Sequence, residues 1–323
     1  MTEFKSALRE TFEGFVRYRK ACGRWNESSY ELNLKLFDRH CLTRFPEETS
    51  LTQEMVNSWC AQRETESNNG CVSRIYVIVS LVRYLRERNR TSVEEPAIPF
   101  PEKRLYIPHA FSQDELERFF MECDRYESPH TPRKTRMNLK YTFPVFFRLL
   151  YSSGMRTTEA RKLRRRDVNL ETGAVGIVNT KGYEQHYIVL HDSMLELMRR
   201  YDAAIECLYP NREYFFPAEN SGYHSRNWVQ SHFRNLWKKV SDAKASAYEF
   251  RHHYAVENIN RVTSGGLSGE NHLIYLSKSM GHRSVDVTAR YYYRLVPSVS
   301  EILREKTEAG FNELVPEVSY EES

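Results

Sequence analysis

Residues 280–297 read MGHRSVDVTARYYYRLVP and place a run of three tyrosines, of which Tyr291 is the first, nine residues after His282. A phenol has a pKa of about 10, so it is a weak nucleophile near neutral pH. It attacks a phosphodiester only where fixed cations stabilise the negative charge that develops. Neighbours on a helix point about 100° apart, so only one of these tyrosines can face a given reaction centre. Such chemistry requires cations from elsewhere in the chain.

Candidate cations lie at four separate places, at Arg156, Lys181, Arg251 and His282. Attack on a phosphodiester adds charge to its non-bridging oxygens, and an arginine presents a fork of N–H donors that suits them. The sequence has no acidic cluster of the metal-binding kind, so we expect fixed cations to replace magnesium, with no metal or nucleotide cofactor. Losing one such donor typically costs on the order of 3 kcal/mol of transition-state stabilisation. The alternative for Arg156 is a helix-capping or salt-bridging role.

Four segments within residues 110–300 resemble, in order and spacing, the boxes of the tyrosine recombinase (phage integrase) family. They are YSSGMRTTEARKLRRRDV with Arg156 and Glu159, VNTKGYEQHYIVL with Lys181, AYEFRHHYA with Arg251, and MGHRSVDVTARY with His282 and Tyr291. The interval from His282 selects Tyr291 as the nucleophile, so Tyr292 and Tyr293 are expected to pack.

The resemblance implies site-specific recombination, in which Tyr291 holds a 3′-phosphotyrosine and the strand passes to a 5′-hydroxyl of a partner duplex. It implies that Glu159 supports the turn at Arg156, that Lys181 protonates the leaving 5′-oxygen, and that His282 donates a hydrogen bond to the phosphate. The favoured interpretation is an integrase or transposon recombinase of a mobile element. The alternatives are a chromosome or plasmid dimer resolvase, a type IB topoisomerase-like relaxing enzyme, and a DNA-binding accessory protein with a weakened active site.

One box departs from the family pattern, because the expected histidine falls on Tyr248, three residues before Arg251. A neutral phenol can donate one hydrogen bond to a phosphate, but it lacks the charge of an imidazolium and is a poor general base near pH 7. His252 and His253 follow Arg251 and point elsewhere on a helix. Our hypothesis is that Tyr248 substitutes for the histidine.

The apolar periodicity predicts a mainly α protein with a small β-hairpin, an α+β fold. Residues 1–92 read as a bundle of four short helices, which resembles the family's core-binding domain, and residues 93–110 contain four prolines and read as a linker. The catalytic domain is expected over 111–296, with a hairpin around Lys181, and a tail helix and acidic end over 297–323.

Basic side chains concentrate in residues 133–166, although the formal net charge of the chain is only +4. A basic block of this kind suits a polyanion, and the alternative is an ordinary solvated helix face. The candidate DNA contacts are Lys134, Arg161, Arg164 and Arg165, with Arg74 and Arg86 from the first domain.

The resemblance also implies partners: a double-stranded DNA site with inverted repeats, and a homo-tetramer that forms on two such sites from a monomer or weak oligomer. An accessory DNA-bending protein would fit the same scheme, and the tail helix would contact a neighbouring protomer. The six cysteines form no CxxC pair, and the N-terminus has no apolar signal segment. We therefore expect a cytoplasmic protein without membrane contact, associated with the nucleoid when on DNA.

Overall fold

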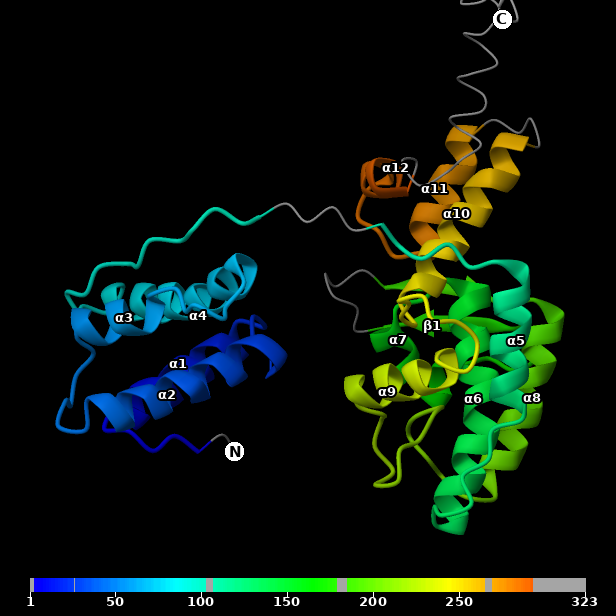
Figure 1. Ribbon diagram of the computed structural model, residues 1–323, viewed down its shortest axis with the longest axis horizontal. Helices are drawn as coiled ribbons and strands as arrows, with labels where there is room; N and C mark the ends of the chain where they lie inside the picture. Colours follow the sequence, from blue (N-terminus) through cyan, green and yellow to red (C-terminus); the bar gives the residue numbers. More distant parts are fainter. Residues whose placement is uncertain (1–2, 26, 103–106, 179–184, 265–268, 293–323) are drawn as a thin grey trace, which may run out of the picture. The chain divides into compact units, whose positions relative to one another are not determined.

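The computed structural model describes residues 3–25, 27–102, 107–178, 185–264 and 269–292, with the side chains of 27–28, 261–264, 269–271 and 290–291 left out. The chain divides into two compact units, Met1–Leu105 and Tyr106–Ser323, each with its own hydrophobic core (Figure 1). The division falls inside the predicted linker. No helix in the described part of the chain is long and apolar enough to cross a membrane.

The first unit is a helical bundle. Its elements are α1 (Arg9–Ala21), a π-helical turn (Glu27–Glu31), α2 (Leu32–Arg44), α3 (Gln53–Cys60) and α4 (Asn68–Arg86). The hydroxyls of Thr52 and Ser67 cap α3 and α4 by accepting backbone N–H bonds, so these two helices begin at Gln53 and Asn68. The side chains of Asn68 and Asn69 then hydrogen-bond the backbone of Phe100 and Glu102. The first part of the predicted linker is therefore fixed to α4.

The second unit is mainly helical with one small sheet, as predicted. Its elements are α5 (Gln113–Asp124), α6 (Arg133–Ser153), α7 (Thr157–Arg161), a 3₁₀ turn (Arg165–Asp167), β1 (Ala174–Ile177), β2 (His186–Val189), α8 (Asp192–Glu206), α9 (Arg226–Trp237), α10 (Glu249–Ser264), α11 (Gly269–Ser279) and α12 (Val285–Tyr292). The strands pair antiparallel, with Ile177 opposite His186. The predicted tail helix lies outside the described residues.

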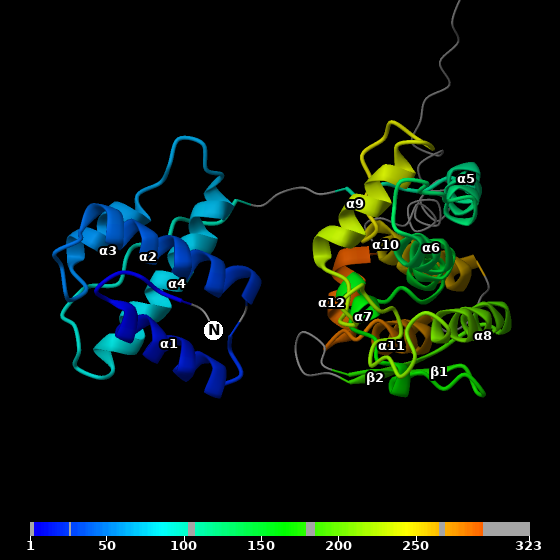
Figure 2. The same cartoon turned by 90° about the horizontal axis from the view of Figure 1, so that it is seen from below.

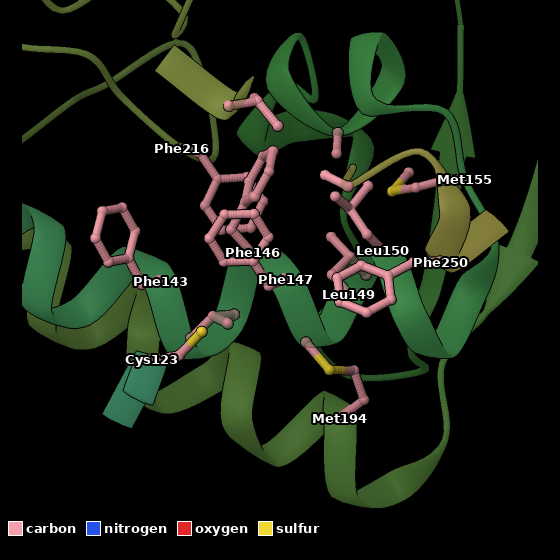
Figure 3. Packing of buried hydrophobic residues seen from close by; sticks show 14 of the residues in the cluster. Cys123, Phe143, Phe146, Phe147, Leu149, Leu150, Met155, Met194, Phe216 and Phe250 are labelled. Atoms are coloured by element: carbon pink, nitrogen blue, oxygen red, sulfur yellow. The ribbon is translucent and has the colours of Figure 1, made fainter. Parts of the chain in front are cut away.

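Helix α6 runs through the centre of the second unit. Phe143, Phe146 and Phe147 lie along it and are fully buried, and Figure 3 shows them with Phe216 and Phe250 from distant parts of the chain. Burying each such side chain stabilises the fold by roughly 1.5–3 kcal/mol. This core fixes the C-terminal end of α6, where the first predicted catalytic arginine follows.

A smaller apolar cluster joins the last three helices that the structure describes. It consists of Ala255 and Ile259 from α10, Leu276 from α11, Met280 directly after α11, and Tyr292 from α12. Helix α11 also contacts strand β2, and Figure 2 shows α7, α11, α12 and β2 on one side of the unit. The four sequence boxes thus converge on one region.

Candidate active site

The turn that carries Arg156 begins where α6 ends. Gly154 takes a left-handed backbone conformation, with φ at 63°, and Arg156 is the residue that precedes α7. The carboxylate of Glu159 accepts one bond from the Arg156 backbone N–H at 2.8 Å and another from Arg156 Nη1 at 2.6 Å. Glu159 therefore supports this turn, as the resemblance implied.

Arg251 reaches the same region from α10, and only 2% of it is exposed. Its Nη1 donates to the carbonyl oxygen of Gly154 at 2.8 Å, and its Nη2 donates to that of Met280 at 2.7 Å. Arg156 Nη2 donates to the carbonyl oxygen of Gly281 at 3.0 Å. Gly281 is also left-handed, with φ at 61°. Backbone carbonyls at two glycine turns thus hold both guanidinium groups in one place.

The acceptors that hold Arg251 are neutral, and the nearby carboxylate of Glu159 is bound to Arg156. Burial and then the charge of Arg156 lower the pKa of Arg251 below its usual range. Its Nε is also buried, with no hydrogen-bond partner among the described residues. A buried cation without an anion is costly, so the pair of arginines forms a site that favours an oxyanion.

His282 completes the cluster. Its Nε2 lies 2.9 Å from Arg251 Nη2, and its Nδ1 lies 2.7 Å from the Oγ1 of Thr288. Burial, followed by Arg251, Arg156 and His186, lowers the pKa of His282 to about 4. The ring is therefore neutral at pH 7, and because a guanidinium only donates, Nε2 accepts from Arg251.

Tyr291 belongs to α12, whose backbone the structure describes, while its side chain lies outside the described part. The next residue, Tyr292, is 3% exposed, and its ring centroid lies 5.7 Å from that of His252 and 6.1 Å from that of His282. Tyr292 is a packing residue, as predicted. Lys181 and Tyr293 lie outside the described residues.

Comparison with known proteins decides the family. Residues 110–297 match the family model described as the phage integrase family. The chain belongs to the phage integrase family. It is accordingly a tyrosine-type, site-specific DNA recombinase, which confirms the predicted family and enzyme class.

Individual relatives of this recombinase are distant. It is 26% identical over 247 residues to tyrosine recombinase XerC of Chlorobaculum parvum, over 70% of this chain and 69% of XerC. Across the curated relatives, the alignments span 44% to 93% of the relative's length. Two solved structures share its fold with TM-scores of 0.58. One is the XerH site-specific recombinase bound to difH substrate, at 20% identity over 89% of this chain and 82% of that one. The other is the Tn1549 transposon integrase in complex with transposon right-end DNA, at 11% identity over 92% and 98%.

Tyr248 lies at the start of the recombinase's α10 and is 44% exposed. Its backbone carbonyl accepts the Arg251 N–H at 3.1 Å, and its ring centroid lies 5.1 Å from that of His252. His252 is 3% exposed, and burial followed by Arg251 lowers its pKa to about 4. His253 packs on Phe111 and Tyr151. Of these three side chains, Tyr248 is the most exposed to solvent.

Sequence reasoning missed His186 of strand β2, which follows the segment that contains Lys181. Its ring packs on Gly281 so closely that a Cβ on that glycine would lie 2.5 Å from His186 Cε1. His186 is also one of the groups that lower the pKa of His282. Thr288 was missed as well. Both are polar residues inside the segments that resemble the family boxes, and no other feature of the sequence indicates their roles.

Two of the predicted DNA contacts are wrong, because the side chains are buried and engaged. Arg74 is 3% exposed and forms an ion pair with Glu66 at 2.6 Å, and it also donates to main-chain carbonyls. Arg161 is 7% exposed and donates to the carbonyl oxygen of His224. Neither guanidinium can reach a phosphate in this fold.

The remaining candidates differ in how far they are engaged. Arg165 is held by two bonds to Asp202, at 2.8 and 3.0 Å, and Lys134 lies 4.1 Å above the ring of Tyr209. Arg164 lies 3.5 Å from Glu213, and Arg86 is exposed. DNA contacts by these residues stay predictions.

Proposed function

We propose that this recombinase cuts and rejoins DNA one strand at a time, with Tyr291 as the nucleophile. The phenol oxygen forms a bond to phosphorus, the P–O5′ bond breaks, the phenol loses its proton, and the 5′-oxygen gains one. The 3′-phosphotyrosine conserves the energy of the phosphodiester, so a 5′-hydroxyl of the partner duplex can reverse the step without ATP. The observation that carries this proposal is the pair of guanidinium groups fixed beside the turn that leads into α12.

The arginine pair is suited to the charge that develops in this reaction. Arg251 has neutral acceptors and a buried Nε, so an oxyanion would relieve the cost of its burial. Arg156 stays 23% exposed at its side chain, so both the entering phosphate and the first turn of α7 lie within its reach. Each preorganised donor of this kind typically contributes about 10²–10³-fold to the rate. These fixed cations supply the charge, so the proposed step uses no metal ion and no nucleotide.

Tyr248 and Lys181 have separate roles in this proposal. The exposed phenol of Tyr248, beside Arg251, donates a hydrogen bond to a non-bridging oxygen. Lys181 protonates the leaving 5′-oxygen, which follows the family resemblance. Tyr248→Phe should slow cleavage and spare DNA binding, and cleavage at the wild-type rate by that variant would exclude a role for its hydroxyl.

The biological setting that we favour is integration or excision of a mobile element. Curated relatives are named integrase/recombinase, and one structural neighbour is a transposon integrase in complex with transposon-end DNA. In this setting, the DNA partner is a site with inverted repeats, and four protomers assemble on two such sites.

Covalent capture from a pool of nicked duplexes of random sequence tests the chemistry and finds the target site in one experiment. The nick lets the cleaved end diffuse away, so a detergent-resistant protein–DNA adduct accumulates and its DNA can be sequenced. We expect inverted repeats around a short spacer to be enriched, and no adduct from Tyr291→Phe.

The same experiment separates the alternatives. Sequence-selective binding by the wild-type protein without any adduct would identify an accessory protein and overturn the proposal. Adducts without site preference, together with relaxation of supercoils by a monomer, would identify a topoisomerase-like enzyme. An adduct that persists in Tyr291→Phe would reassign the nucleophile.

A further inference from the structure

The ring of His282 lies between a cation and a hydroxyl. Arg251 Nη2 is 2.9 Å from its Nε2, and the Oγ1 of Thr288 is 2.7 Å from its Nδ1. Thr288 belongs to α12, three residues before Tyr291, and is fully buried. Tyr292 stacks on the same ring with an angle of 17° between the planes. The ring is thus held at both nitrogens and on one face.

The protons in this chain of contacts follow from the donor inventory. A guanidinium has no acceptor, so Arg251 donates and Nε2 accepts. A neutral imidazole then has its proton on Nδ1 and donates to Thr288 Oγ1. A hydroxyl can both donate and accept, so Thr288 can also serve the opposite tautomer, in which Nδ1 accepts and Nε2 has the proton. No apolar residue of the same shape can do this.

The surroundings of His282 keep its ring neutral. Burial disfavours a positive charge on it most, and Arg251 on α10, Arg156 before α7 and His186 on β2 act in the same direction. An imidazolium would have a proton on both nitrogens and would need no tautomer control. A neutral ring can present a donor to a phosphate only if Nε2 has the proton, so the group that holds Nδ1 decides whether it can.

We propose that Thr288 is a positioning residue that sets the tautomer of His282 and reverses its own hydrogen bond when DNA binds. In the free protein, Thr288 accepts from Nδ1–H while Arg251 occupies Nε2. When a phosphodiester oxygen takes the Arg251 N–H, Nδ1 releases its proton to water, Nε2 takes one from water, and the Thr288 hydroxyl donates to Nδ1. The ring stays neutral throughout, and Nε2–H faces the phosphate. This inference rests on the proposed function, because it requires the phosphate to bind at Arg251.

Threonine variants test the kinetic consequence. Thr288→Val keeps the shape and removes the hydroxyl, and it should lower single-turnover cleavage of captured sites about tenfold or more. Thr288→Ser should restore the rate to near the wild-type value. Thr142→Val is the matched control, because Thr142 is equally buried and hydrogen-bonds Asn138 away from the site. Wild-type cleavage by Thr288→Val would overturn the proposal, as would a loss in Thr142→Val of equal size.

Nitrogen NMR of the imidazole tests the tautomer directly and needs no catalysis. With ¹⁵N-labelled histidine and His282→Gln for assignment, we expect Nδ1–H in the free protein and Nε2–H when Tyr291→Phe binds a captured duplex. The same tautomer in both states would overturn the inference, even if Thr288→Val folds poorly. Absence of any adduct in the wild-type protein would instead defeat the proposed function, while leaving the free-state tautomer measurable.

Discussion

A pair of matched substitutions, Arg251→Met and Arg212→Met, should separate an arginine kept for chemistry from one kept for stability. Both arginines are buried in the second unit. Arg212 forms ion pairs with the carboxylates of Asp202 and Glu206, whereas the hydrogen bonds of Arg251 go to neutral acceptors. Methionine keeps much of the length of either side chain and removes its charge.

The expected magnitudes differ because of the partners left behind. Arg212→Met leaves the buried carboxylate of Asp202 with Arg165 as its remaining cation, and breaking a buried pair costs up to about 3–5 kcal/mol of unfolding free energy. Arg251→Met loses hydrogen bonds worth about 1.5–3 kcal/mol each, but it removes a buried unpaired charge whose desolvation costs several kcal/mol. These terms oppose each other, so we expect a net change within about 2 kcal/mol. The cleavage rate of Arg251→Met should fall by at least about 10²-fold.

The assay is urea unfolding of the full chain, read beside adduct formation on captured sites. We expect Arg251→Met to be folded and inactive, and Arg212→Met to be clearly less stable. If Arg251→Met lost as much stability as Arg212→Met, Arg251 would be a structural cation. Neutral acceptors around a buried arginine would then not mark it as catalytic.

Further predictions concern the glycine turn, acid stability and the first unit. Gly281→Ala should abolish adduct formation, because the backbone φ of Gly281 is 61° and the new Cβ would clash with the ring of His186. Gly173→Ala is the control in the same assay, because Gly173 has a similar φ of 74° but a new Cβ there would make only ordinary contacts. The pKa values of His224, His252 and His282 in the folded protein are lowered to about 3, 4 and 4. At a pH below the ordinary histidine pKa of about 6.5, these three residues therefore bind more protons in the unfolded chain than in the folded one. The free energy of unfolding should therefore be highest above about pH 6.5 and should fall towards pH 4, by up to about 1.4 kcal/mol per pH unit for each ring. Urea unfolding at pH 7 and at pH 5 measures this difference, and equal unfolding midpoints would contradict the prediction. Arg74→Ala should destabilise the first unit by about 3–5 kcal/mol, whereas Arg86→Ala should leave thermal unfolding unchanged and reduce the salt dependence of DNA binding by about one charge; a stable Arg74→Ala would count against the buried ion pair.

The elements and the boxes could be predicted from the sequence because both depend on local rules. Apolar spacing indicated the mainly helical fold and the helical bundle of the first unit, and the alternating runs beside Lys181 indicated the hairpin. The errors involve partners distant in the chain. Nothing near Arg161 indicates that the carbonyl of His224 will take its guanidinium, so a basic run looked like a DNA-binding face.

Within the site, the types of residue could be predicted from the sequence, but the hydrogen bonds that hold them in place could not. The supports of Arg251 are main-chain carbonyls of Gly154 and Met280, which every residue possesses and no composition reveals. The contact of His186 with Gly281 depends on how strand β2 packs against the end of helix α11, and no local sequence pattern predicts that packing.

The carbonyl-held arginines have a consequence for handling the protein. A pair of fixed guanidinium groups does not distinguish a DNA phosphate from a small oxyanion in the buffer, so sulfate, phosphate or orthovanadate should compete with substrate. The same ions should raise the melting temperature, since a ligand at 100 times its Kd adds about 2.7 kcal/mol to the folded state. Arg251→Met should lose this response in a thermal-shift titration with sulfate. Buffers with high concentrations of these salts would therefore give the protein with the highest thermal stability and the lowest activity.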